Sequence, residues 1–290
     1  GFLVDVVSPD TTLFAEGPTL KLESQSGFAL ELHHVDVKNG RFNRVDGDSA
    51  VYDAVILNHD QSVPLNVDWK NFVTPVAPSP FAGWTRRQKN AHFAHYQQVA
   101  NEFCRKFSIN PDLIQAKFRA VEGVDFDTKE GIDKLSDEVG ALLGELPAGS
   151  TVFAKASQGT YGMGISVFTS KDEVLAMNRK TRNKMDIGKN NIKFTSVLVQ
   201  EGVETIVKVD DAPGEITTYL VGGRAMGGFM RYNPQRGTNA NLNSQGMLYK
   251  KFCISDICQD TDTHIKEAVY ALVGRLSVLA ASRELRELNK

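Results

Sequence analysis

The sequence predicts an α+β fold, and three observations support it. Residues 1 to about 60 contain short runs in which apolar and polar side chains alternate, the period-two pattern of half-buried strands. From Phe93 onward, and again from Ile132 onward, apolar residues instead recur at helical spacing. Residues 151–168 then form a β-prone run, a loop with three glycines and a second β-prone run, which indicates strand, loop, strand.

Composition limits the class of protein. The chain has 290 residues, of which 41% are hydrophobic and 23% charged, so it is long enough for two or three globular modules. The formal net charge of -2 offers no electrostatic argument for binding nucleic acid or an anionic membrane. No apolar run reaches the roughly 20 residues that span a bilayer. Composition therefore gives no indication of a nucleic-acid or membrane partner, and it carries no information on the oligomeric state.

Cysteine usage indicates a reducing compartment. Cys104, Cys253 and Cys258 are an odd number without paired metal-ligand spacing, which favours reduced thiols in a cytoplasmic protein. The chain begins at Gly1 rather than at Met, so we expect it to be truncated or processed at its N-terminus.

The N-terminal part is predicted to be β-rich. A turn at residues 24–27 separates two alternating runs and suggests a hairpin. The mostly apolar run from Val51 to Leu57 is predicted to be a buried strand. Asn58 and Asp60, which follow it, are candidates for the substrate side of a sheet, although both residue types also form turns through their own side chains.

A cluster of prolines marks a connection between modules. Pro75, Pro78 and Pro80 interrupt regular structure, so we place the connection at about residues 70–83. Three modules are therefore expected: an N-terminal α/β substrate-side module at 1–75, a helical connector with a small subdomain at 76–150, and nucleotide-binding and catalytic subdomains at 151–290.

Cations gather just before the first predicted helix. Arg86, Arg87 and Lys89 lie where the helix dipole favours anions, so they are not placed to stabilise the helix. They are candidates for binding a substrate carboxylate or phosphate, and the alternative is a solvated charged surface.

The segment from Lys155 to Gly164 suggests phosphate binding. Glycines let backbone N–H groups approach a polyphosphate, and the lysine at the strand end adds positive charge. The spacing does not fit a P-loop, because the lysine precedes the glycines, or a Rossmann turn, because a strand follows. A glycine-rich hairpin without a ligand is the alternative.

Further predicted elements follow this loop in order. Ser170 to Glu173 is a capping-box pattern that begins a helix, and a strand at 196–199 continues into Gln200-Glu201-Gly202-Val203. Gly222-Gly223 is a preferred pair for a tight hairpin turn, and an asparagine-rich loop and a long helix from about Thr263 complete the chain.

This order of parts resembles the ATP-grasp ligases, and more closely the ATP-grasp-type glutamate–cysteine ligase family. The resemblance spans about residues 50–290 and rests on a set of short motifs. They are Leu57-Asn-x-Asp60, Gly83-Trp-x-x-Arg87-x-x-x-x-His92-Phe93, Lys155-Ala-x-x-Gly159-Thr-Tyr-Gly162-Met-Gly164, Asn178-Arg-Lys-x-Arg-Asn-Lys-Met185, Gln200-Glu-Gly-Val203, Gly227-Gly-Phe-x-Arg231 and Asn241-Leu-Asn243-x-x-Gly-Met247.

The resemblance implies an ATP-grasp fold preceded by the N-terminal module, and ATP-dependent joining of glutamate to cysteine, the first step of glutathione synthesis, with Mg²⁺. It also implies roles for individual residues. Phosphates would be held by Lys155 with the loop residues Gly159, Tyr161, Gly162 and Gly164, and adenine and ribose by Gln200, Glu201 and Val203. Arg231 would stabilise the transferring phosphoryl group, Arg86 and Arg87 would bind substrate carboxylates, and Glu215, Asn241 and Asn243 would supply metal ligands.

One departure from the family pattern concerns the metal. An acidic residue precedes the first asparagine of the Asn-Leu-Asn loop in that pattern, and Ala240 stands there in this chain. Two other readings therefore remain open: another ATP-grasp carboxylate–amine ligase, and an ATP-binding protein without catalysis.

Overall fold

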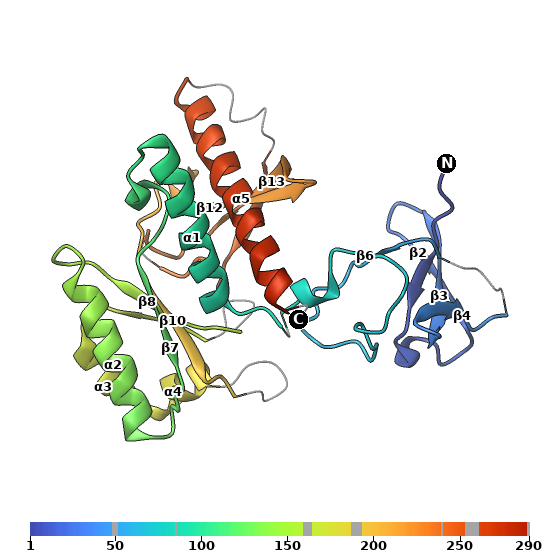
Figure 1. Cartoon of the computed structure of the whole chain (residues 1–290), viewed down its shortest axis with the longest axis horizontal. Coiled ribbons are helices and arrows are strands. Elements are labelled where there is room, and N and C mark those ends of the chain that lie inside the picture. Colours follow the sequence, from blue (N-terminus) through green and yellow to red (C-terminus); the bar gives the residue numbers. More distant parts are fainter. Residues whose placement is uncertain are drawn as a thin grey trace. The chain divides into compact units, whose positions relative to one another are not determined.

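The chain forms two compact units, residues 1–86 and 87–290 (Figure 1). The computed structural model describes residues 1–47, 52–84, 86–158, 164–186, 193–238, 240–252 and 261–288, except for the side chains of Phe252 and of residues 261–267. The predicted mixture of helices and sheets is confirmed. The break between the units lies just after the predicted connection at residues 70–83.

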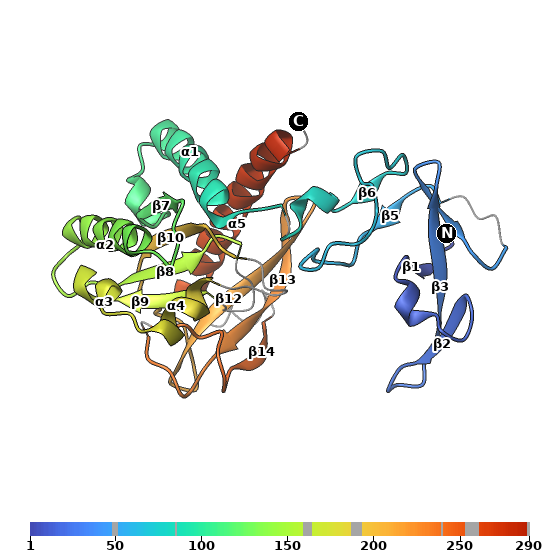
Figure 2. The same ribbon diagram turned by 90° about the horizontal axis from the view of Figure 1, so that it is seen from below.

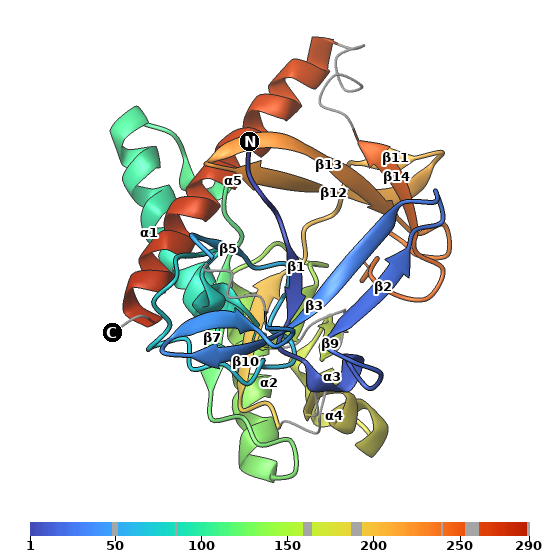
Figure 3. The same ribbon diagram turned by 90° about the vertical axis from the view of Figure 1, so that its right-hand side faces the viewer.

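The first unit is built around β3 (Ala29–Lys38), which is flanked by three other strands. It pairs in parallel with β1 (Val6–Ser8) and antiparallel with β2 (Thr19–Glu23) and β4 (Arg41–Arg44), as Figure 3 shows for β1–β3. The predicted hairpin is thereby confirmed. Its turn closes where the Ser24 N–H donates to the carbonyl oxygen of Phe28, at 2.9 Å.

The rest of this unit is less regular than expected. Two short strands, β5 (Val55–Ile56) and β6 (Val76–Ala77), pair in parallel, and the two helices are 3-10 turns at Thr11–Leu13 and Pro80–Ala82. Its described residues contain no α-helix, so they do not form the α/β module that was predicted.

The prediction of a buried strand from Val51 to Leu57 is wrong for the described part of that run. Only two residues are strand, and Ile56 is 80% exposed. An apolar run predicts burial only where another layer covers it, and a two-residue strand at this position has no such cover. Asp60 acts as a turn former, because its Oδ1 accepts from the Ser62 N–H at 2.9 Å.

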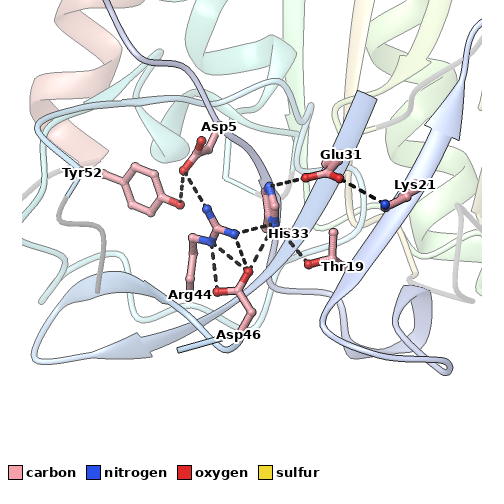
Figure 4. Close-up of polar contacts among 8 residues, drawn as sticks. All are labelled: Asp5, Thr19, Lys21, Glu31, His33, Arg44, Asp46 and Tyr52. Atoms are coloured by element: carbon pink, nitrogen blue, oxygen red, sulfur yellow. Dashed lines mark hydrogen bonds and ion pairs between the residues drawn. The ribbon is translucent and has the colours of Figure 1, made fainter. Parts of the chain in front are cut away.

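Polar contacts, more than apolar packing, hold one face of the N-terminal sheet together (Figure 4). Arg44 of β4 makes an ion pair with Asp46 and lies 3.6 Å from Oδ2 of Asp5. The same guanidinium donates to Nδ1 of the buried His33 on β3, at 3.0 Å. Tyr52 donates to Asp5 at 3.1 Å, so residues from four separate segments join one polar network around Arg44.

The second unit contains an antiparallel sheet in the order β7-β10-β8-β9. Its strands are β7 (Phe118–Glu122), β8 (Val152–Ala156), β9 (Ile165–Phe168) and β10 (Ser196–Glu201). One face is covered by α2 (Lys129–Gly144), α3 (Lys171–Leu175) and α4 (Arg179–Asp186) (Figures 1 and 2). The core between them includes Leu135 and Val139 of α2 against Val197 and Val199 of β10.

Side-chain caps begin two helices in this part, and the one before α3 follows the predicted capping box. Thr128 caps α2, with its Oγ1 accepting from the Gly131 N–H at 3.2 Å. Ser170 caps α3 by accepting from the Glu173 N–H at 3.3 Å. Because β7 and α2 share a sheet and core with β8–β10, the sequence-based division after residue 150 falls inside one structural layer.

A second sheet in this unit has the order β11-β12-β13-β14 (Figure 3). It comprises β11 (Lys208–Val209), β12 (Ala212–Val221), β13 (Arg224–Tyr232) and β14 (Leu248–Phe252). The predicted Gly222-Gly223 turn joins β12 and β13, and both glycines have positive φ, at 57° and 73°. This is the backbone conformation that a two-residue type I′ hairpin requires.

Two long helices complete the second unit. α1 (Lys89–Phe107) and α5 (Thr261–Leu288) pack against each other through Val99, Leu276 and Ala280. A 3-10 turn at Pro111–Leu113, capped by Asn110, leads from α1 to β7. None of the described helices is long and apolar enough to cross a membrane.

Candidate active site

Lys155 lies at the centre of the candidate site, one residue before the end of β8. Its neighbours Ala154 and Ala156 are fully buried on the helix-covered side, so alternation along the strand directs Lys155 to the other face. There its Nζ donates to Oε1 of Gln200 on β10, at 2.9 Å. The ammonium also lies 5.6 Å from the ring centroid of Phe153.

A second lysine approaches the same strand end from α1. The Lys89 N–H donates to the carbonyl oxygen of Ser157 at 3.0 Å, and its Nζ donates to those of Ala156 and Ser157 at 3.2 and 3.4 Å. The chain is thus fastened to β8 where the glycine-rich loop begins. Lys89 was one of the three predicted cations, but its position beside Lys155 could not be inferred from sequence.

Burial changes the proton affinity of both lysines. It lowers the pKa of Lys155, against the opposing effect of the Glu215 carboxylate. It also lowers the pKa of Lys89 to about 8, with a further contribution from the charge of Lys155. Two partly dehydrated cations that sense each other form a site that an anion would stabilise, which is the usual setting of a functional site rather than of a surface.

The second sheet contributes a charge pair. Glu215 of β12 lies opposite Arg231 of β13, and Oε1 of the glutamate is 2.6 Å from Nε of the arginine. The charge of the Glu215 carboxylate opposes the lowering of the pKa of Lys155 by burial, so β12 carries a carboxylate within electrostatic range of the Lys155 ammonium. Glu215 keeps a second carboxylate oxygen that this ion pair does not use.

The predicted adenine-binding segment follows directly from β10. The N–H of Glu201 donates to the carbonyl oxygen of Lys117 at 2.9 Å, and that of Gly202 to the carbonyl oxygen of Thr151 at 2.7 Å. These two donors are therefore already used. Val203 is 63% exposed, so this residue is the part of the segment that a base could reach.

The asparagine-rich loop is held by hydrogen bonds of its own. Oδ1 of Asn241 accepts from the Asn243 N–H at 3.1 Å, and the fully buried Asn233 donates to the carbonyl oxygens of Leu242 and Gln245 at 3.3 and 3.2 Å. Among the described residues, no group of three His, Cys, Asp or Glu side chains is arranged to hold a metal ion. A metal here would need oxygens from the amides or from a ligand.

Part of the predicted phosphate loop lies outside the described residues, including Gly159, Tyr161 and Gly162. Gly164, at the end of the loop, has a positive φ of 64°. A Cβ at this position would lie 2.6 Å from that of Ala156, so only glycine allows the loop to return this close to β8. Its carbonyl oxygen accepts from the Ala156 N–H at 2.7 Å.

The two predicted carboxylate-binding arginines occupy different surroundings. Nε and Nη2 of Arg87 donate to Oε2 of Glu284 on α5, at 3.0 and 2.9 Å, and Nη2 also lies 2.9 Å from Nδ1 of His92. Arg87 therefore ties α1 to α5. Arg86 belongs to the first unit, is exposed, and lies 5.8 Å above the ring of Phe81.

Comparison with known proteins identifies the family. The chain matches the family model described as glutamate-cysteine ligase (GshA) over residues 1–285. The chain belongs to the glutamate–cysteine ligase family. A solved structure described as a "putative gamma-glutamylcysteine synthetase" from Methylobacillus flagellatus KT is 30% identical, with a TM-score of 0.75. The alignment covers 93% of this chain and 66% of that chain, just under two thirds. No curated protein matches.

Proposed function

We propose that this member of the glutamate–cysteine ligase family joins the γ-carboxylate of L-glutamate to the amine of L-cysteine at the expense of ATP. Family membership supports the reaction class. The observation that carries the proposal for this chain is the partly buried Lys155, bonded to Gln200 on one sheet and within electrostatic range of Glu215, which pairs with Arg231 on the other. Such an arrangement suits an ATP-grasp fold, in which two subdomains close on the nucleotide, and we propose that fold for residues 87–290.

The chemistry requires two successive displacements. An oxygen of the glutamate γ-carboxylate attacks the γ-phosphorus of ATP, and the bond to ADP breaks to leave an acyl phosphate. The amine of cysteine then attacks the acyl carbon, phosphate departs and the amine loses a proton. Lys155 would hold phosphate oxygens and Arg231 would face the transferring group, because preformed cations lower the cost of its charge.

The remaining roles follow from what each group has free. The backbone of the exposed residue Val203 would contact adenine, and Glu201 would contact the ribose. Mg²⁺ commonly binds through one or two carboxylates together with substrate phosphates, and it would neutralise phosphate charge. The second oxygen of Glu215 and the side chains of Asn243 and Asn241 fit that need, since Oδ1 of Asn241 keeps a lone pair beside its hydrogen bond from the Asn243 N–H.

Release of ADP provides the test. It is measured with glutamate plus cysteine, with each alone, and with cysteine replaced by other amines. Release that depends on both substrates supports the proposal. Release only with another substrate pair would indicate a different carboxylate–amine ligase, and nucleotide binding without turnover would indicate a protein that binds ATP without catalysis. The assay should contain a reducing agent that keeps the substrate cysteine and the protein thiols reduced, since we expect a cytoplasmic protein.

A further inference from the structure

A cavity of about 210 Å³ lies within the first unit, lined only by residues 61–86. It is smaller than the ~300–1,000 Å³ pockets that take drug-sized ligands, so it suits a metabolite of amino-acid size. Its apolar wall includes Leu65 and Phe81. Three charged side chains also line it: Asp68, Lys70 and Arg86.

The wall of this cavity is fixed by packing. Trp69 packs edge-on against Phe42 and Phe72, with ring centroids 6.1 and 5.2 Å apart. Gln61, which is 3% exposed, has a positive φ of 53°, and its side-chain Nε2 lies 3.1 Å from Nδ1 of His59. Such constraints fix the floor of the pocket, while its charged residues Asp68, Lys70 and Arg86 lie at the exposed mouth.

Gly83 allows Gln61 to take this position. A Cβ on Gly83 would lie 2.2 Å from the Cβ of Gln61 and 2.6 Å from its Cγ, so any other residue would displace the buried amide. Only glycine at position 83 therefore leaves room for Gln61, which lines the pocket.

The three charges are available to a ligand. Arg86 and Lys70 make no salt bridge within the described residues, and the guanidinium of Arg86 is oriented over Phe81 at 5.8 Å. Asp68 accepts from Asn71 Nδ2 at 2.7 Å and from the Lys70 N–H at 3.2 Å, which leaves further lone pairs on both oxygens. The hydrogen bond from Asn71 lowers the pKa of Asp68, so this group stays ionised at neutral pH.

We propose that this cavity is the glutamate subsite, with Arg86 and Lys70 binding the two carboxylates and Asp68 the α-ammonium. Two cations and one anion complement a dicarboxylic α-amino acid, which carries two negative charges and one positive charge. Cysteine, with a single carboxylate, would leave one of the two cations unpaired. The assignment deepens the proposed ligase function and rests on it for the identity of the amino acid.

Binding without nucleotide tests the subsite separately from catalysis. Isothermal titration with L-glutamate, L-glutamine and glutarate is done on the full chain and on Arg86→Gln, Lys70→Gln and Asp68→Asn. Glutamate should bind the unmodified chain, and each variant should weaken that binding roughly 10- to 100-fold, as for loss of one charged hydrogen bond. Lys70→Gln or Arg86→Gln should reduce the ratio of glutamate affinity to glutamine affinity, because glutamine lacks the second carboxylate. Asp68→Asn should leave glutarate affinity unchanged, because glutarate has no ammonium group.

Matched controls are available in the same unit. Arg41→Gln and Asp53→Asn change exposed residues outside the cavity and should leave glutamate binding within about twofold. Gly83→Ala should weaken binding without removing any charge, because it displaces Gln61. Glutamate affinity within twofold of the unmodified chain in the three charge variants, or tighter binding of cysteine than of glutamate, would overturn the assignment.

Steady-state kinetics separate failure of the subsite from failure of the ligase reaction. The charge variants should raise KM for glutamate by the same factor and leave KM for ATP unchanged. Ligase turnover with an unaltered KM for glutamate would reject the subsite and keep the function. Glutamate binding at this cavity in a chain that never releases ADP would reject the function and keep the subsite.

Discussion

Two lysines of the candidate site are kept partly away from water, which distinguishes them from the many lysines on the surface. Burial penalises their charged forms, and each lies near the other. A bound polyphosphate would relieve both costs. At the scale of single residues, then, the candidate site holds two partly buried cations close together, and we expect an anionic substrate to offset the cost of burying their charge.

Loss of the Lys155 ammonium should impair the transfer of the phosphoryl group. We expect Lys155→Ala to reduce turnover by roughly 100- to 1,000-fold, the range found when a preorganised charge-stabilising donor is removed. Lys106→Ala, at the exposed end of α1, is the matched control and should retain full activity. Turnover and ATP affinity both unchanged in Lys155→Ala would place the nucleotide elsewhere.

The low pKa of Lys89 should appear in the pH dependence of stability. Its pKa is about 8 in the folded chain and 10.5 ordinarily, so the unfolded state binds more protons between these values. The free energy of unfolding contributed by Lys89 should therefore rise with pH through this window, while below about pH 8 the cost of burying the charge is fully present.

Urea midpoints at about pH 7 and pH 9.5, compared between the unmodified chain and Lys89→Met, isolate this effect from other titrating groups. The gain in stability caused by Lys89→Met should be larger at the lower pH. An equal gain at both values would mean that Lys89 is better hydrated than its contacts indicate.

At the scale of secondary-structure elements, hydrogen bonds and ion pairs decide how α1 and α5 join. Arg87 binds the buried carboxylate of Glu284, and His92 donates to Ser277 at 3.0 Å. Burial would raise the pKa of Glu284, but hydrogen bonds from His92 and Arg87 hold it below its usual value. The ion pair between Arg87 and Glu284 thus holds α5 to the start of α1, and removal of either residue alone should lower the free energy of unfolding.

Removing one partner of this pair should destabilise the second unit. Arg87→Met leaves the buried Glu284 carboxylate with His92, 3.4 Å away, as its remaining partner in the described part of the chain, so the loss should be at most about 3–5 kcal/mol, the range found when a buried pair is broken from one side. The double variant Arg87→Met/Glu284→Leu removes both charges and should recover much of that loss, as measured by chemical denaturation. If the double variant is as unstable as Arg87→Met alone, the lost stability comes from packing and not from the loss of the Arg87 charge beside the Glu284 carboxylate.

At the scale of the whole molecule, the proposed chemistry divides between the two units. Lys155, Gln200, Glu215 and Arg231 all lie in residues 87–290, whereas the charged cavity lies in residues 1–86. The division predicts that nucleotide binding and amino-acid binding can be separated by cutting the chain.

A fragment of residues 87–290 should fold and bind ATP without ligase activity. The sheet β7-β10-β8-β9 with its helices and the α1–α5 pair have their own cores, so near-UV circular dichroism should report fixed tertiary packing. Binding of a fluorescent ATP analogue should remain within about tenfold of that of the whole chain. A fragment that folds but shows no nucleotide binding would mean that residues 1–86 complete the ATP site.

Local sequence determined much of the secondary structure of this protein. The Gly222-Gly223 turn, the cap at Ser170 and the strands at 152–156 and 165–168 each depend on neighbouring residues, so short patterns predict them. Family membership was also readable from sequence, because it rests on motifs in a fixed order.

Only the tertiary structure decided which residues meet. Arg86 and Arg87 are adjacent in sequence, yet one lines a cavity of the first unit and the other binds Glu284, about 200 residues away in sequence. Likewise, Lys89 reaches β8, and the run ending at Leu57 stays largely uncovered. These outcomes depend on contacts between segments far apart in the chain, where burial and charge pairing are set by partners that a local pattern does not contain.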